Sequence, residues 1–241
     1  AALADIVDLA QPLPLRWPVG YEATRDIALR ATRSDEEWDA LRRSGALGDW
    51  RRPLHPTPPP PAEHDWSSGN VVLITGASRG FGAAAAAELA RRGNTVVATM
   101  RNPERDGPAV VAAAPDRIEA VRLDVTEPDE VAAVVARTIE RHGRIDAVVN
   151  NAGYGLWGPV EALREDELRR QFDTNLLGQW RLVRAVAPHL RAQRSGKIVN
   201  VSSLSGRVPS PMLAPYAASK HAVEAFTEAL REELATWGVT A

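Results

Sequence analysis

The sequence predicts a doubly wound α/β fold of the Rossmann type, with helices on both faces of a parallel sheet. Two observations lead to this prediction. From residue 70 onward, short runs of β-branched and other apolar residues alternate with helical stretches. These runs are nearly continuous in hydrophobic residues, as in strands that are buried on both faces. We therefore expect a three-layer αβα sandwich.

The expected elements follow one another regularly along the chain. Glycines follow two of the predicted helices, at Gly93 and Gly143, where the left-handed conformation that ends a helix costs a glycine little. Pro128 suits the first turn of a helix, because its nitrogen needs no hydrogen-bond acceptor there. We expect strands over 71–75, 95–99, 118–123, 145–149 and 197–201, and helices over 83–92, 128–142, 164–193 and 215–237.

Composition excludes several classes of function. The 241 residues contain 29 Lys and Arg against 31 Asp and Glu, so no basic surplus points to nucleic acid or an anionic membrane. The absence of cysteine excludes disulfides and thiol nucleophiles, and the five scattered histidines predict no metal site. The longest run of small apolar residues, 83–87, is too short to span a bilayer. No secretory signal is recognised, so we expect a cytoplasmic protein.

A proline-rich stretch divides the chain. Pro56 and the run 58–61 favour an extended, semi-rigid conformation, and Ser67, Ser68 and Gly69 follow them. We interpret residues 49–69 as a linker, although a proline-rich ligand for an adaptor domain is an alternative. The predicted organisation is a segment over 1–48, this linker, and a Rossmann domain over 70–241.

The turn after the first predicted strand is rich in glycine. Residues 75–82 read TGASRGFG and stand directly between that strand and the next helix. Gly76 allows a tight turn, Gly80 lets the backbone approach a pyrophosphate, and Gly82 allows the helix to pack closely on the strand. The amino end of the helix adds unpaired N–H groups and a positive dipole. This context predicts a binding site for a dinucleotide.

Five further motifs extend this pattern. They are Leu-Asp-Val at 123–125, Asn-Asn-Ala-Gly at 150–153, Asn175, the pair Ser202-Ser203, and Tyr-x-x-x-Lys at 216–220. With the glycine turn, these motifs resemble, in content and order, those of the short-chain dehydrogenase/reductase family over residues 70–241. The resemblance implies hydride transfer between an alcohol and a carbonyl with a nicotinamide cofactor.

The tyrosine and lysine of the last motif suit acid–base chemistry. Tyr216 and Lys220 are four residues apart, so on a helix they share one face. A tyrosine pKa of about 10 is too high for a base at neutral pH, and a neighbouring ammonium lowers it. Tyr216 is therefore expected to exchange the proton with the substrate oxygen, while Lys220 also binds the nicotinamide ribose. The resemblance further implies that Ser203 holds the carbonyl oxygen and that Asn175 anchors a water for proton transfer.

The expected cofactor is NADP(H) rather than NAD(H). NAD-preferring Rossmann folds place an acid after the second strand, but here that strand leads to Arg101. Arg79 and Arg101 could clamp a 2′-phosphate, the alternative being that both are ordinary surface arginines. The cofactor-binding residues implied by the resemblance are Gly76, Ser78, Arg79, Gly80, Phe81, Gly82, Arg101, Asp124, Val125, Asn151, Ala152, Gly153, Tyr216 and Lys220.

Within the family, residues 151–159 and 216–234 are most similar to the hydroxysteroid-dehydrogenase-like branch. This similarity implies a small apolar alcohol or carbonyl substrate, and Trp157 and Met212 either line its pocket or simply pack. The long helices 164–193 and 215–237 resemble the pair through which the family forms dimers and tetramers, so a homodimer or tetramer is expected.

The chain also departs from the family pattern. The sixth strand and the substrate loop are expected to be missing, and residues 1–48 resemble the C-terminal end of the same family. The chain would then be a fragment of a tandem protein or a circular permutant, unless residues 1–48 are an unrelated helical extension. Function has two corresponding candidates, an active oxidoreductase and a non-catalytic cofactor-binding or interaction module.

Overall fold

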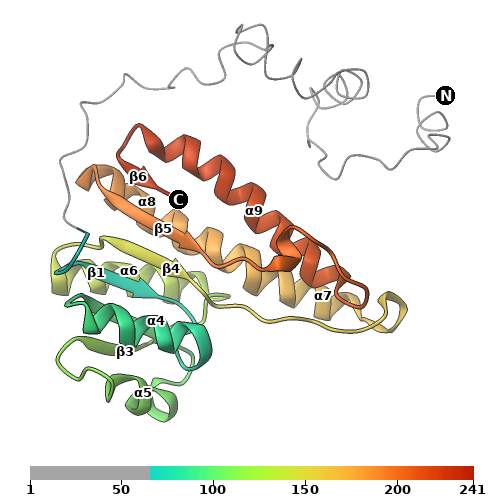
Figure 1. The fold of residues 1–241 in the computed structure, drawn as a ribbon, viewed down its shortest axis with the longest axis horizontal. Helices are drawn as coiled ribbons and strands as arrows, with labels where there is room; N and C mark the ends of the chain where they lie inside the picture. Colours follow the sequence, from blue (N-terminus) through green and yellow to red (C-terminus); the bar gives the residue numbers. More distant parts are fainter. Residues whose placement is uncertain (1–65) are drawn as a thin grey trace, which may run out of the picture. The chain divides into compact units, whose positions relative to one another are not determined.

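The computed structural model describes residues 66–241, and Figure 1 shows their fold. The interpretations of residues 1–48 and of the linker up to residue 65 lie outside the described residues. Six strands form one parallel sheet in the order β3-β2-β1-β4-β5-β6. They are β1 (Val71–Ile74), β2 (Thr95–Met100), β3 (Ile118–Arg122), β4 (Ala147–Asn150), β5 (Gly196–Asn200) and β6 (Val239–Thr240). This order confirms the predicted fold class.

Helices lie on both faces of the sheet (Figure 1). On one face, α4 and α5 pack over β1 to β3. On the other face, α6, α8 and α9 pack over the sheet, and α7 lies beside α9. The helices are α4 (Gly80–Arg91), α5 (Pro103–Val111), α6 (Pro128–His142), α7 (Glu165–Phe172), α8 (Gly178–Gln193) and α9 (Ala214–Ala235). Shorter turns are the 3₁₀ helices η1 (Val160–Ala162) and η3 (Leu204–Gly206) and the π-helix η2 (Asp173–Leu177).

The two faces differ in how far helices cover them. The core on the α6, α8 and α9 side includes residues from β1, β4 and β5, among them Leu73, Val148 and Ile198. The core on the α4 and α5 side contains no residue of β5 among the described residues. Val199 of β5 is consequently 47% exposed, although it lies in an interior strand.

The helical stretch expected over 164–193 is found over 165–193, but residues 173–177 within it form the π-helix η2, which separates α7 from α8. The helix α5 was not predicted, since Gly107 and Pro108 in its interior normally disfavour a helix. Here the glycine is needed for packing, because a Cβ at Gly107 would lie 2.8 Å from the Cβ of Ala120. Tertiary packing therefore overrides local propensity in this helix.

The expectation that the sixth strand is missing is also wrong in part. Val239 and Thr240 form β6 and pair with Gly196 and Lys197 of β5. The chain can reverse after α9 because Gly238 adopts φ +70°, which a glycine tolerates without a steric penalty.

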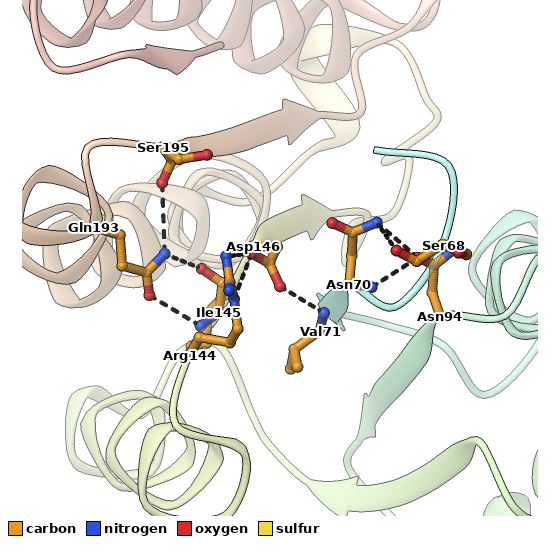
Figure 2. Close-up of polar contacts among 9 residues, drawn as sticks. All are labelled: Ser68, Asn70, Val71, Asn94, Arg144, Ile145, Asp146, Gln193 and Ser195. Atoms are coloured by element: carbon orange, nitrogen blue, oxygen red, sulfur yellow. Dashed lines mark hydrogen bonds and ion pairs between the residues drawn. The ribbon is translucent and has the colours of Figure 1, made fainter. Parts of the chain in front are cut away.

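A polar network fixes the amino ends of the central strands (Figure 2). The buried carboxylate of Asp146 accepts hydrogen bonds from the backbone N–H of Val71 at 2.8 Å and from Arg144 Nε at 2.8 Å. Gln193 donates to the carbonyl of Ile145 at 2.8 Å. This network aligns β1 with β4 at the end of the sheet opposite to the motif residues, so its role is structural.

No helix in the part of the chain that the structure describes is long and apolar enough to cross a bilayer.

Candidate active site

The glycine turn joins β1 to α4 at the carboxyl edge of the sheet. Gly76 and Gly80 adopt φ +65° and +61°, which L side chains rarely tolerate. The helix α4 begins at Gly80, three residues earlier than predicted. The last glycines of the motif, Gly80 and Gly82, therefore lie in the first turn of the helix. It has neither a side-chain cap nor an acidic residue in its first turn, and the space beside Gly80 is open. This arrangement fits the diphosphate of a dinucleotide, because the first-turn N–H groups can donate to an anion.

Two side chains hold the turn in place. The side-chain amide of Asn151 donates to the carbonyls of Thr75 and Gly76, both at 3.0 Å. The hydroxyl of Thr75 accepts from the backbone N–H groups of Asn151 and Ala152, also at 3.0 Å. Asn151 therefore steadies the glycine turn. Thr75 was not predicted as a functional residue, although its position before the first glycine was an available signal.

Asp124 and Val125 form the loop between β3 and α6. One carboxylate oxygen of Asp124 accepts from the backbone N–H of Thr126 at 3.0 Å and from its hydroxyl at 2.7 Å. Burial raises the pKa of Asp124, but these bonds and the charges of Arg101 and Arg122 outweigh burial and hold the pKa below its ordinary value. The Asp124 carboxylate in this loop is thus held by Thr126 and favoured in its ionised form.

The two arginines of the predicted clamp are exposed at this edge. Arg79 is the residue before α4, and Arg101 follows β2. The carbonyl of Arg101 accepts a hydrogen bond from Arg122 Nη1 at 2.8 Å, which fixes the backbone there. Each guanidinium lies near an acid. The charge of Arg79 contributes to lowering the pKa of Asp106, and the charge of Arg101 contributes to lowering the pKa of Asp124.

Asn175 is fully buried in the π-helix η2. Its amide oxygen accepts from the backbone N–H of Tyr154 at 3.0 Å, and its amide nitrogen donates to the Tyr154 carbonyl at 2.9 Å. The same nitrogen lies 3.1 Å from Ser219 Oγ, which in turn donates to the carbonyl of Tyr216 at 2.8 Å. Ser219 had no predicted role. Three segments distant in sequence therefore meet at Asn175.

Lys220 lies beside this cluster. Only 4% of Lys220 is exposed, and burial lowers its pKa. Its ammonium donates to the carbonyl of Val201 at 2.7 Å and lies 5.9 Å from the centroid of the Tyr216 ring. A Cβ at Gly153 would lie 3.1 Å from Asn175 Oδ1 and 3.7 Å from Lys220 Nζ. A glycine at 153 therefore lets the loop after β4 pass close to both groups.

Ser203 follows β5 at the same edge of the sheet. Its hydroxyl accepts from the backbone N–H of Ser205 at 3.1 Å. The turn η3 that begins after it packs on α9, since a Cβ at Gly206 would lie 3.2 Å from the Lys220 carbonyl. An ion pair between Arg207 and Glu224, at 2.8 Å, closes this contact. Ser203 is thereby attached to the turn of α9 that carries Lys220.

Apolar side chains are exposed on two loops beyond β4 and β5. Trp157 is 69% exposed and Met212 is 46% exposed. The two loops are joined by a hydrogen bond from the Gly158 N–H to the Met212 carbonyl at 2.9 Å. Neither side chain is part of the buried core of the described residues.

Residues 70–241 match the profile of the family described as short chain dehydrogenase. The chain belongs to this family. The expected resemblance is thus confirmed for these residues, and with it the assignment to a family of oxidoreductases that bind NAD(P).

Individual relatives agree with this assignment. This short-chain dehydrogenase is 42% identical to oxidoreductase BOA17 of Botryotinia fuckeliana, over 70% of the chain and 62% of the relative. It is also 42% identical to a 3beta-hydroxysteroid dehydrogenase of Mediterraneibacter gnavus, with coverages of 70% and 62%, in line with the hydroxysteroid-like resemblance. The chain thus spans about 62% of the length of these two relatives.

A solved structure has the same fold. It is a gluconate 5-dehydrogenase from Burkholderia cenocepacia in complex with NADP and tartrate. The TM-score is 0.68 at 34% identity, and the alignment covers 72% of this short-chain dehydrogenase and 69% of the other chain.

Proposed function

We propose that this short-chain dehydrogenase interconverts an apolar secondary alcohol and its ketone, or an aldehyde, with NADP(H) as cofactor. The observation that carries the proposal is the buried Lys220 ammonium, 5.9 Å from the Tyr216 ring centroid and next to Asn175. Tyr216 and the buried ammonium share one face of α9, so the Tyr216 hydroxyl is the group placed to exchange a proton with a bound alcohol or carbonyl.

Each residue then has a separate task. Tyr216 gives a proton to, or takes it from, the substrate oxygen, and Ser203 holds that oxygen by a hydrogen bond. Lys220 lies beside the Tyr216 ring and would bind the nicotinamide ribose. Asn175 holds a water that returns protons from Lys220 to solvent. The bound cofactor would supply or accept the hydride.

The substrate class is proposed from the exposed apolar loops. Trp157 and Met212 stand at the carboxyl ends of the strands, where ligands bind in open α/β sheets. An exposed apolar surface of this kind suits an apolar substrate, because binding removes that surface from water.

The NADP(H) preference is testable through the two arginines. In the Arg101→Ala variant, and in the Arg79→Ala variant, NADPH affinity should fall about tenfold, because a charge-assisted bond to the 2′-phosphate is lost. NADH affinity should change little. The measurement is a fluorescence titration of the whole chain with each cofactor.

The matched control for this titration is Arg141→Ala. Arg141 is another exposed arginine, but it pairs with Glu119 at 2.9 Å near the C-terminal end of α6. Unchanged NADPH affinity in both clamp variants would contradict the preference. Failure of the wild-type chain to bind either cofactor would contradict the proposed function itself.

A cofactor-binding module without turnover is a second candidate. The partly exposed Val199 favours it, because the α4 side of β5 is uncovered among the described residues. NADPH binding without oxidation or reduction of any apolar alcohol or ketone in a broad panel would support this candidate over the first.

We further propose that the protein is a dimer through α8 and α9. A groove of about 360 Å³ lies between these helices, with Trp180, Arg184, Phe226 and Glu233 among its lining residues. Basic residues on α8 and an acid on α9 allow reciprocal pairing across a twofold axis. Trp180→Lys should convert the dimer to a monomer, because it places a charge in the apolar contact.

Light scattering coupled to gel filtration measures this outcome. Trp157→Lys is the control, since Trp157 is also an exposed tryptophan but lies outside the groove. A wild-type chain that is monomeric at high concentration, or dissociation by both substitutions alike, would argue against the interface.

A further inference from the structure

Arg181, in the first turns of α8, bridges two segments of the candidate site, the loop after β3 and the π-helix that contains Asn175. Its side chain is only 17% exposed. One guanidinium nitrogen, Nη2, donates to Asp173 Oδ1 at 2.6 Å. The other, Nη1, lies 3.3 Å from the carbonyl of Val125 and 3.5 Å from that of Asp173. The planar guanidinium directs two separate nitrogens to the two partners, whereas an ammonium would have to reach both from a single nitrogen.

The first partner belongs to the loop after β3. Val125 follows Asp124, whose carboxylate is held by Thr126, and the N–H of Asp124 donates to Glu130 at 2.7 Å. The loop also packs tightly on α8, because a Cβ at Gly178 would lie 2.7 Å from Val125 Cγ2. A displacement of this loop is therefore transmitted to the beginning of α8 through packing and through Arg181.

The second partner begins the π-helix that contains Asn175. The carbonyl of Asp173 accepts the N–H of Gly178, which closes this wide turn. Wide turns of this kind are less stable than regular helix and occur mostly where a function requires them. The ion pair with Arg181 holds Asp173 in this position and so maintains the turn from which Asn175 reaches Tyr154 and Ser219.

We infer that Arg181 is a positioning residue that couples the Asp124–Val125 loop to the π-helix around Asn175. This inference rests on the proposed function, because it takes Asp124 and Val125, which are among the expected cofactor-binding residues, as the contact for the adenine half of the cofactor. Filling the adenine half then stabilises the Asn175 turn before any nicotinamide is present. The coupling acts through the Val125 carbonyl, the guanidinium and the Asp173 carboxylate.

The test uses a ligand that can occupy only the adenine half. Adenosine 2′,5′-bisphosphate is added to the whole chain, and hydrogen exchange is followed at the backbone amides of residues 174–178. In the wild type the ligand should slow exchange there about tenfold, a coupling of ordinary size between two sites. In Arg181→Met the same saturating ligand should slow exchange less than about twofold.

Two further variants separate coupling from loss of structure. Arg184→Met is the matched control, because Arg184 lies on the same helix over the Trp180 ring, 5.3 Å from its centroid. It should retain the full response to the ligand. Arg181→Lys keeps a cation for Asp173 but loses the fork, so its exchange without ligand should equal the wild type while the response to ligand is lost.

The outcomes are distinct. If the wild type does not bind the bisphosphate, the proposed function fails and the coupling fails with it. If the wild type binds and the Arg181 variants respond as the wild type does, only the coupling is overturned. If Arg181→Met does not fold, the response of Arg181→Lys decides between the two results.

Discussion

Replacing Tyr216 with phenylalanine should reduce turnover about a thousandfold, within the range that a positioned acid or base contributes to catalysis. The substitution removes one hydroxyl and keeps the ring, whose centroid lies 5.9 Å from the Lys220 ammonium. The backbone carbonyl of Tyr216 still accepts from Ser219, so the Asn175 cluster is retained. Turnover is measured with a panel of apolar alcohols and ketones by following NADPH absorbance.

The internal control is cofactor affinity of the same variant. NADPH binding should stay within about twofold of the wild type, because the substitution leaves Lys220, the proposed contact of the nicotinamide ribose, unchanged. Residual turnover above about a tenth of the wild type would exclude Tyr216 as the proton-transfer group. A parallel loss of binding would instead indicate that the hydroxyl holds the cofactor.

Replacing Gly76 with alanine should lower the free energy of unfolding by about 3 kcal/mol, from the strain of a positive φ and from overpacking. Gly76 adopts φ +65°, and an added Cβ would lie 2.8 Å from the Cα of Ala152 and 3.1 Å from its nitrogen. Ala152 cannot withdraw easily, because its N–H is bonded to Thr75 Oγ at 3.0 Å. Urea unfolding followed by circular dichroism measures the difference.

Gly80→Ala provides the matched comparison. Gly80 has nearly the same backbone, with φ +61°, but a Cβ there would meet nothing within 4 Å. Only the conformational strain applies, so this variant should lose about 1 kcal/mol. Equal losses in the two variants would mean that the contact with Ala152 is softer than the structure implies. A change in the denaturant slope would indicate altered compactness instead.

Local patterns in the sequence sufficed for a large part of the fold and the candidate site. The strands, the glycine turn and the helix α6, predicted over 128–142 and found there, depend on residues that are neighbours in the chain. The same holds for Tyr216 and Lys220, because four residues bring two side chains to one face of a helix. The motif order then pointed to the family.

Other features follow from contacts between residues far apart in the sequence. Asn175 meets Ser219 across 44 residues, and Arg181 meets Val125 across 56. The π-helical turn η2 within the long helix and the short pairing of β6 with β5 also have no local signature. Gly107 in α5 has a reason only beside Ala120.

The chain by itself therefore determined the family, the order of the elements and the identity of the chemical groups. Only the tertiary structure decided that Lys220 is buried, that Asn175 sits on a π-helix and that Arg181 joins two loops. The physical reason is that periodicity reports on interactions within one helix or strand. Burial, hydrogen-bond partners and close backbone approach depend on which elements pack together.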